Sequence, residues 1–216
     1  MKMRYTDIIF DVDGTLIDTE KTGVLSFLQT VKELKGEEWS YERGYTVFGI
    51  PSSKVADFIG YPDGRLFEEV WERHFIEMRH LASPFPGMED ILKAAKSAGL
   101  RTGIVSSRSR REYDLDWQFA PYTHYFDYVV LADATERHKP FPDPIYKYIE
   151  MASEGLVEKI SPSDCIYLGD TDHDSGCAHA AGCDFALADW RKRGMQGISA
   201  EYHFTDAQEA IEIILQ

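Results

Sequence analysis

The sequence has few cysteines and no apolar run long enough to cross a membrane. Its three cysteines, Cys165, Cys177 and Cys183, form an odd set without CxxC spacing, which argues against a disulfide framework and against a zinc site. We expect them to be reduced thiols in the core, as in cytosolic proteins. The apolar stretch within residues 1–14 is too short for a signal peptide, and no segment approaches the ~20 apolar residues of a transmembrane helix. These features predict a cytoplasmic protein.

Basic residues are also scarce, because 23 lysines and arginines stand against 37 aspartates and glutamates, a formal net charge of -14. Such a surface repels nucleic acid and anionic lipid, so neither nucleic acid nor a membrane is expected as a partner. A phosphorylated substrate would need a local basic pocket or a bound cation. The length of 216 residues suits one medium domain, or one with a small inserted domain, in a monomer or homodimer.

Apolar strands and helical segments alternate over most of the chain. A buried strand is expected at residues 8–12, directly before a turn signal. Further strands are expected at 102–106, 128–131, 165–168 and 185–187, with helices between them, one of them from about Ser175 to Ala181. Thr205 and Gln208 are expected to form a capping box for a final helix. This alternation predicts a doubly wound, Rossmann-like parallel sheet of the α/β class. Its active site should lie at the carboxyl ends of the strands.

Residues 18–84 interrupt this alternation. Their apolar residues recur at helical spacing, as in Val24, Leu28 and Val31, and no strong strand is visible among them. We therefore expect residues 1–17 and 85–216 to form the α/β core, and residues 18–84 to form an inserted helical domain.

Two carboxylates directly follow the first strand, in the segment Asp11-Val12-Asp13-Gly14-Thr15. In extended backbone, residues i and i+2 point the same way, so one carboxylate could attack a substrate while the other moves protons. Gly14 permits a sharp turn that presents backbone N–H groups to a phosphate. Taken alone, the segment is equally compatible with a turn that carries two solvated acids.

A second acidic cluster, Asp170, Asp172 and Asp174, follows the strand at 165–168. Clustered carboxylates repel one another unless a cation or a proton relieves them, and hard oxygen ligands suit Mg²⁺. A solvated acidic loop is the alternative. His173 is expected to be a surface loop residue rather than a metal ligand.

Two more polar residues are placed near the same sheet edge. Lys139 lies in the proline-rich loop His138-Lys139-Pro140, where a fixed ammonium could hold a phosphate. Ser106 ends a predicted strand and could donate a hydrogen bond to a phosphoryl oxygen, although such a serine is often only a turn or cap residue.

Together these residues resemble the haloacid dehalogenase superfamily of phosphohydrolases. Its four motifs are matched in order by FDVDGTLIDT, by Ser106 at the end of TGIVS, by Lys139 in HKPFPDP, and by Gly169-Asp170 with Asp174. The helical residues between the first two motifs are similar to the small helical cap of the branch that holds phosphoglycolate phosphatases and β-phosphoglucomutases.

The resemblance implies a Mg²⁺-dependent phosphatase that uses a phospho-aspartate on Asp11. Asp13 would protonate the leaving group and then activate water. Mg²⁺ would be bound by Asp11, the Asp13 carbonyl and Asp170, with Asp174 steadying the metal site. Ser106 and Lys139 would hold the transferring phosphoryl group. Thr15 would support the catalytic loop, and Gly14 would let that loop turn toward the phosphate.

Two alternatives to a phosphatase stay open. A mutase of the β-phosphoglucomutase type usually carries a histidine soon after the first motif and an arginine in the cap. The corresponding stretches here, Thr22-Gly23-Val24 and Gly49-Ile50-Pro51-Ser52-Ser53, contain neither. A catalytically inactive binding module is disfavoured by the intact motifs. A dehalogenase is disfavoured by Asp13, because that chemistry needs no leaving-group acid.

Substrate choice is expected to depend on the cap. The first candidates are Ser52, Ser53 and Lys54, although an ordinary turn between helices is nearly as plausible. Ser107 and Arg108, with Ser109, follow Ser106 and could face the leaving group. The basic loop at residues 190–193 is more typical of a solvated turn. Phosphoglycolate, a sugar phosphate and a nucleotide all remain candidate substrates.

Overall fold

The computed structural model describes residues 4–47, 50, 52–115, 119–194 and 197–214. Within these ranges, six strands form one parallel sheet in the order β5-β4-β1-β6-β7-β8. The strands are β1 (Asp7–Phe10), β4 (Arg101–Val105), β5 (Tyr128–Val130), β6 (Cys165–Gly169), β7 (Asp184–Ala188) and β8 (Tyr202–Phe204). The chain starts in the middle of the sheet at β1, which pairs with β4 on one side and β6 on the other.

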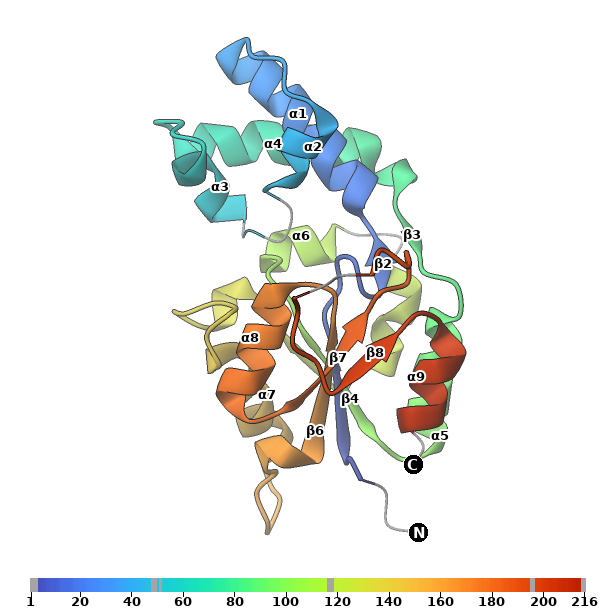
Figure 1. Cartoon of the computed structure of the whole chain (residues 1–216). Helices are drawn as coiled ribbons and strands as arrows, with labels where there is room; N and C mark the ends of the chain where they lie inside the picture. The colour runs from blue at the N-terminus through green and yellow to red at the C-terminus, as the bar shows by residue number, and fades with distance from the viewer. Residues whose placement is uncertain (1–3, 48–49, 51, 116–118, 195–196, 215–216) are drawn as a thin grey trace.

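Helices cover both faces of this sheet (Figure 1). One face packs against α5 (Met88–Ser97) and α9 (Ala207–Ile214), and the other against α7 (Asp143–Ala152) and α8 (Asp172–Ala181). Successive residues of a strand point to opposite faces, so Ile8 and Phe10 enter the first layer and Ile9 the second. The doubly wound parallel sheet predicted from the sequence is confirmed.

Four helices lie above the carboxyl ends of the strands in Figure 1, and we call them the cap helices. They are α1 (Glu20–Lys35), α2 (Tyr41–Tyr45), α3 (Ser52–Phe58) and α4 (Gly64–Met78). Phe27, Val31, Phe67 and Val55 form a buried apolar cluster within this layer. Two short antiparallel strands, β2 (Ile17–Asp18) and β3 (Ser83–Pro84), mark where the chain enters and leaves it.

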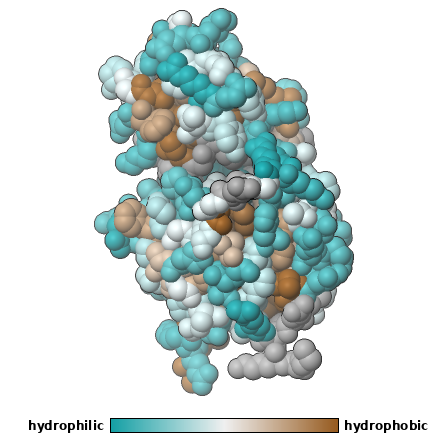
Figure 2. All heavy atoms as spheres, in the orientation of Figure 1, coloured by the Kyte–Doolittle hydropathy of each residue, from teal (hydrophilic) through white to brown (hydrophobic). Residues whose placement is uncertain are grey.

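Short helical segments complete the described elements. They are α6 (Arg110–Asp114), η1 (Arg79–Leu81), η2 (Ala120–Tyr125), η3 (Ala132–Ala134) and η4 (Pro162–Asp164). No helix of the described ranges is long and apolar enough to cross a membrane. Cys165, Cys177 and Cys183 are free and buried, as expected. Hydrophilic residues prevail on the face seen in Figure 2, in keeping with the acidic composition.

Several boundaries differ from the sequence expectation. The helix expected to begin at Ser175 starts at Asp172, because Thr171 caps it and forms a capping box with Asp174. The strand β8 and the β2–β3 pair were not predicted. They are too short for a clear period-2 signal.

The capping box expected between Thr205 and Gln208 is wrong. The side chain of Asp206 accepts the backbone N–H groups of Gln208 and Glu209, while Thr205 donates to Glu209. Aspartate is an equally good N-cap residue, so the sequence pattern allowed two caps one residue apart.

Candidate active site

The predicted catalytic residues converge at the carboxyl ends of three adjacent strands. Asp11 follows β1, Ser106 follows β4, and Asp170 follows β6. Asp174 joins them from the first turn of α8, and Lys139 from the loop before α7. One oxygen from each of Asp11, Asp170 and Asp174 lies within 4.8 Å of the other two. The fold therefore gathers into one cluster residues that lie up to 163 positions apart (11 to 174).

Lys139 is the buried cation of this cluster. Its Nζ atom lies 2.9 Å from Asp11 Oδ1 and 2.7 Å from Asp174 Oδ1, and only 6% of its side chain is exposed. Burial opposes the charge, but the two carboxylates outweigh it and raise the pKa of Lys139 above its ordinary value. Lys139 is therefore a fixed positive charge beside Asp11.

Asp170 packs directly against the turn after β1. Gly14 has a φ of +81°, and a Cβ atom there would lie 2.0 Å from a carboxylate oxygen of Asp170, so only glycine fits. Asp170 is buried and its Oδ1 atom has no hydrogen-bond partner. Burial raises the pKa of Asp170 well above its usual range, and the charges of Asp174 and Asp11 add to this. An unpartnered buried oxygen beside other carboxylates fits a hard divalent cation such as Mg²⁺.

Asp11 lies close to both Lys139 and Asp170. Burial raises its pKa to about 7; Lys139 opposes that rise, and Asp174 and Asp13 add to it. A cation at the free oxygen of Asp170 would add a second positive charge near Asp11 and favour its ionised form. The site can therefore hold an ionised, partly desolvated carboxylate, which is the state that a nucleophile needs.

Both oxygens of Asp174 already accept hydrogen bonds from the protein. Oδ1 accepts from Lys139 and from the Tyr167 hydroxyl at 2.9 Å, and Oδ2 accepts from the backbone N–H and hydroxyl of Thr171. Burial raises the pKa of Asp174, but the charge and hydrogen bond of Lys139 outweigh it and hold that pKa below its usual range. Asp174 thus orients Lys139 as well as lying near Asp170.

Tyr167 belongs to this network and was missed from the sequence. Its hydroxyl lies 3.2 Å from Lys139 Nζ and 2.9 Å from both Asp174 Oδ1 and the Val105 carbonyl oxygen. The available signal was a tyrosine within an otherwise apolar buried strand, since the hydroxyl of a buried tyrosine usually needs a partner.

Asp13 is held by a different cation. Arg108 grips it with two nitrogens, Nε at 2.7 Å from Oδ2 and Nη2 at 2.8 Å from Oδ1, while the Thr19 hydroxyl donates to Oδ1 at 2.6 Å. Burial raises the pKa of Asp13, but the Arg108 charge and its hydrogen bonds outweigh burial and hold the pKa below its usual value. The sequence placed Arg108 near the leaving group and did not foresee this pair.

Ser106 and Thr15 are buried at the edge of the cluster. The Ser106 hydroxyl accepts the backbone N–H of Arg108 at 3.3 Å. The Thr15 hydroxyl has no hydrogen-bond partner, whereas its carbonyl accepts the Trp190 indole N–H at 2.8 Å. Ser106 and Thr15 thus keep hydroxyl hydrogens available near the carboxylates.

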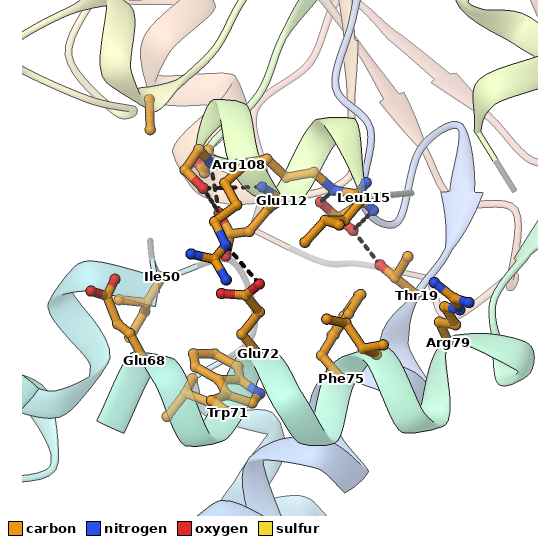
Figure 3. A pocket seen from close by; sticks show the side chains of 18 of the residues that line it. Thr19, Ile50, Glu68, Trp71, Glu72, Phe75, Arg79, Arg108, Glu112 and Leu115 are labelled. Atoms are coloured by element: carbon orange, nitrogen blue, oxygen red, sulfur yellow. Dashed lines mark hydrogen bonds and ion pairs between the residues drawn. The ribbon is translucent and has the colours of Figure 1, made fainter. Parts of the chain in front are cut away.

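A cleft of about 520 Å³ opens between this cluster and the cap helix α4 (Figure 3). Asp11, Asp13 and Lys139 line its floor, and Ser107 and Arg108 also reach it. That Ser107 and Arg108 face the leaving group stays a prediction.

Ser109 lines the cleft as well, whereas the prediction for the cap residue Lys54 is not supported. Lys54 is exposed and is absent from the described lining, and the expectation for Ser52 and Ser53 falls on side chains outside the described structure. In the basic loop at residues 190–193, two arginines form ion pairs with the segment where the chain enters the cap helices. Arg191 pairs with Asp18 at 2.5 Å, and Arg193 with Glu20 at 2.8 Å.

Comparison with known proteins finds hydrolases and phosphatases among the similar sequences. Residues 8–188 match the family model described as haloacid dehalogenase-like hydrolase. A phosphoglycolate phosphatase of Aquifex aeolicus is 31% identical over 186 residues, covering 85% of this chain and 84% of that protein. The pyrophosphatase PpaX of Bacillus cereus (strain G9842) is 27% identical over 207 residues, covering 92% and 89%.

Solved structures share the fold. A Lactobacillus plantarum protein predicted to be a phosphoglycolate phosphatase superposes with a TM-score of 0.85 at 22% identity, covering 98% of this chain and 100% of that one. CbbY from Rhodobacter sphaeroides, in complex with phosphate, superposes with a TM-score of 0.78 at 20% identity, covering 95% and 96%.

Proposed function

This chain belongs to the haloacid dehalogenase-like hydrolase family, and we propose that it is a Mg²⁺-dependent phosphatase that hydrolyses a small phosphate monoester through a phospho-aspartate on Asp11. One observation carries the proposal. The Asp11 carboxylate is buried between the Lys139 ammonium and a cluster in which the Asp170 oxygen has no protein partner. Such a site can take one phosphoryl group together with one divalent cation.

In the first step, an Asp11 oxygen attacks the phosphorus atom and the bond to the leaving-group oxygen breaks. Asp13 donates a proton to that oxygen, which leaves as an alcohol. Lys139, Ser106 and backbone N–H groups after Asp11 hold the phosphoryl oxygens. Mg²⁺, held by Asp11, Asp170 and the Asp13 carbonyl, would supply positive charge that offsets the charge of the transferring group.

In the second step, Asp13 accepts a proton from water, the water oxygen attacks phosphorus, and the bond to Asp11 breaks. Phosphate and the free Asp11 carboxylate result. Arg108 favours the ionised form of Asp13, which this step needs. The first step needs the protonated form, so Asp13 must then exchange Arg108 for the leaving-group oxygen.

The names of the relatives bear on the substrate. They add pyrophosphate to phosphoglycolate, a sugar phosphate and a nucleotide as candidates. We further propose that residues 18–84 act as the cap over this site, and that the enzyme works in the cytoplasm, where its three free thiols would stay reduced.

Phosphate release from p-nitrophenyl phosphate and 2-phosphoglycolate tests the proposal. Turnover should require Mg²⁺, vanish with a chelator, and fall when Ca²⁺ replaces Mg²⁺, because looser coordination can draw both Asp11 oxygens onto the metal. Asp11→Asn is the matched control, since it keeps the shape but cannot form an acyl phosphate. Full activity in excess chelator, or near wild-type turnover by Asp11→Asn, would contradict the mechanism. Interconversion of hexose phosphates with little phosphate release would favour a mutase.

A further inference from the structure

The cap side of the cleft presents an apolar surface to the catalytic residues. Phe75 rises from α4 toward Leu115, the residue that ends α6 on the core side (Figure 3). Leu115 is 40% exposed. The other apolar residues on the cap side of the lining are Val24, Val47, Ile50, Trp71, Ile76 and Ala82.

Trp71 is a rigid part of the apolar surface on the cap side of the cleft. Its indole N–H donates to the Ser26 hydroxyl at 2.9 Å, and its ring lies edge-on to Phe27 and Phe67. The tryptophan therefore cannot swing into the cleft, and a group bound above α4 meets a fixed aromatic and aliphatic face.

The arginines of the lining are already engaged. Arg108 holds Asp13, Arg111 Nε lies 2.8 Å from Glu72, and Arg65 Nε lies 3.0 Å from Glu69. Arg79 also has an interaction partner. Lys139, the fifth cation of the described lining, is committed to the catalytic carboxylates.

Negative charge prevails in the described lining. Five cations face seven carboxylates: Asp11, Asp13, Glu68, Glu69, Glu72, Glu112 and Asp133. A bound Mg²⁺ would balance the phosphoryl group. A second anionic group on the leaving alcohol would meet this excess of carboxylates, and it would have to compete with Glu72 or Glu69 for an arginine or stay unpaired.

We infer that the natural leaving group is an uncharged alcohol with an apolar face of at least ring size, such as an arylalkyl alcohol or a nucleoside. The inference rests on the proposed phosphatase chemistry. The cleft of about 520 Å³ is large enough, since small-molecule sites span roughly 300–1,000 Å³. A lining with this excess of negative charge disfavours pyrophosphate and phosphoglycolate, because their leaving groups carry negative charge.

Three esters with alkoxide leaving groups test the inference in the Mg²⁺-loaded enzyme. They are 2-phenylethyl phosphate, ethyl phosphate and 3-phosphonooxypropanoate, which carry a ring, neither group, and a carboxylate. We expect kcat/KM for the phenylethyl ester to exceed that of each of the others at least about tenfold, because even one methylene in an apolar pocket is worth roughly 10–200-fold. Equal values, or a preference for the carboxylate ester, would overturn the inference and leave the phosphatase proposal intact.

The variant Phe75→Ala tests whether the preference for the phenylethyl ester depends on the apolar face of α4. Its loss in kcat/KM should be at least about fivefold larger for the phenylethyl ester than for ethyl phosphate. Phe58→Ala is the matched control, because Phe58 is a 60% exposed aromatic residue of cap helix α3 outside the described lining. An equal loss for both esters in Phe75→Ala would overturn the assignment to this face. Failure of the wild-type enzyme on every ester, p-nitrophenyl phosphate included, would instead overturn the phosphatase proposal itself.

Discussion

The cleft has a core wall, on the side of the sheet, and a cap wall, on the side of α4. The charged residues of the two walls differ in how deeply they are buried. On the core wall, Asp11, Lys139 and Asp174 are almost fully buried and satisfy one another in a closed network. At the cap wall, charged residues pair near water: Glu72 of α4 pairs with Arg111 of α6, whose side chain is 76% exposed. Apolar side chains such as Phe75 share this lining with the exposed pairs.

From this difference we expect the core wall to serve catalysis and the cap wall to serve substrate choice. Removing one member of a buried ion pair costs roughly 3–5 kcal/mol because it strands the other, whereas exposed pairs contribute roughly 0–1 kcal/mol. The core wall therefore tolerates little change, while the cap wall can change with little cost to folding. Variants of the core wall should damage all substrates, and variants of the cap wall should discriminate among them.

Asp13→Asn should give the largest effect and sharpen the contrast, because Asp13 is a core-wall residue whose loss still depends on the leaving group. General acid–base assistance is worth roughly 10²–10⁴-fold, and an alkyl ester should lose at least that in the first step. A nitrophenolate needs little protonation, so p-nitrophenyl phosphate should be largely spared there. Stopped-flow mixing should then show a burst of about one nitrophenolate per active site. Equal first-step losses for both esters would mean that Asp13 is not the leaving-group acid.

Lys139→Met tests the core wall through stability. In chelator, it leaves Asp11 and Asp174 buried without their cation, so the free energy of unfolding should fall by roughly 3–5 kcal/mol. Urea unfolding measures this, and added Mg²⁺ should recover part of the loss. Lys147→Met is the matched control, since Lys147 pairs with Glu150 on the exposed side of α7 and should change stability by less than ~1 kcal/mol. A loss of that small size for Lys139→Met would contradict the closed network.

Arg108→Gln should give the smallest of these effects, a shift in pH dependence. Arg108 lowers the pKa of Asp13 against the opposing effect of burial, so its removal should raise that pKa. Hydrolysis of the phospho-enzyme needs ionised Asp13. The acidic limb of kcat for p-nitrophenyl phosphate should therefore move to higher pH. Arg111→Gln removes an exposed arginine of the same cleft and should leave the limb in place. An unmoved limb in both variants would show that Arg108 does not set the ionisation of Asp13.

The sequence by itself determined the sheet and most of the candidate active site at its edge. Apolar runs separated by helical periods require strands buried on both faces, and parallel strands place their carboxyl ends together. Asp11, Ser106 and Asp170 each follow such a strand, so their meeting followed from chain order alone. The start of α8 lies three residues before the expected one, because Thr171 and Asp174 form a capping box in a stretch whose acidic residues also suit a loop.

Only the tertiary structure decided which side chains pair across the site. These pairs join segments that lie far apart in the sequence, and no local pattern encodes them. They are Tyr167 with Lys139, Arg108 with Asp13, and Arg191 with Asp18. The apolar face of the cleft was equally hidden, since Phe75 shares its helical spacing with residues that fill the core of the cap helices. Periodicity tells which side of a helix is apolar, but whether that side meets another helix or an open cleft depends on how the layers pack.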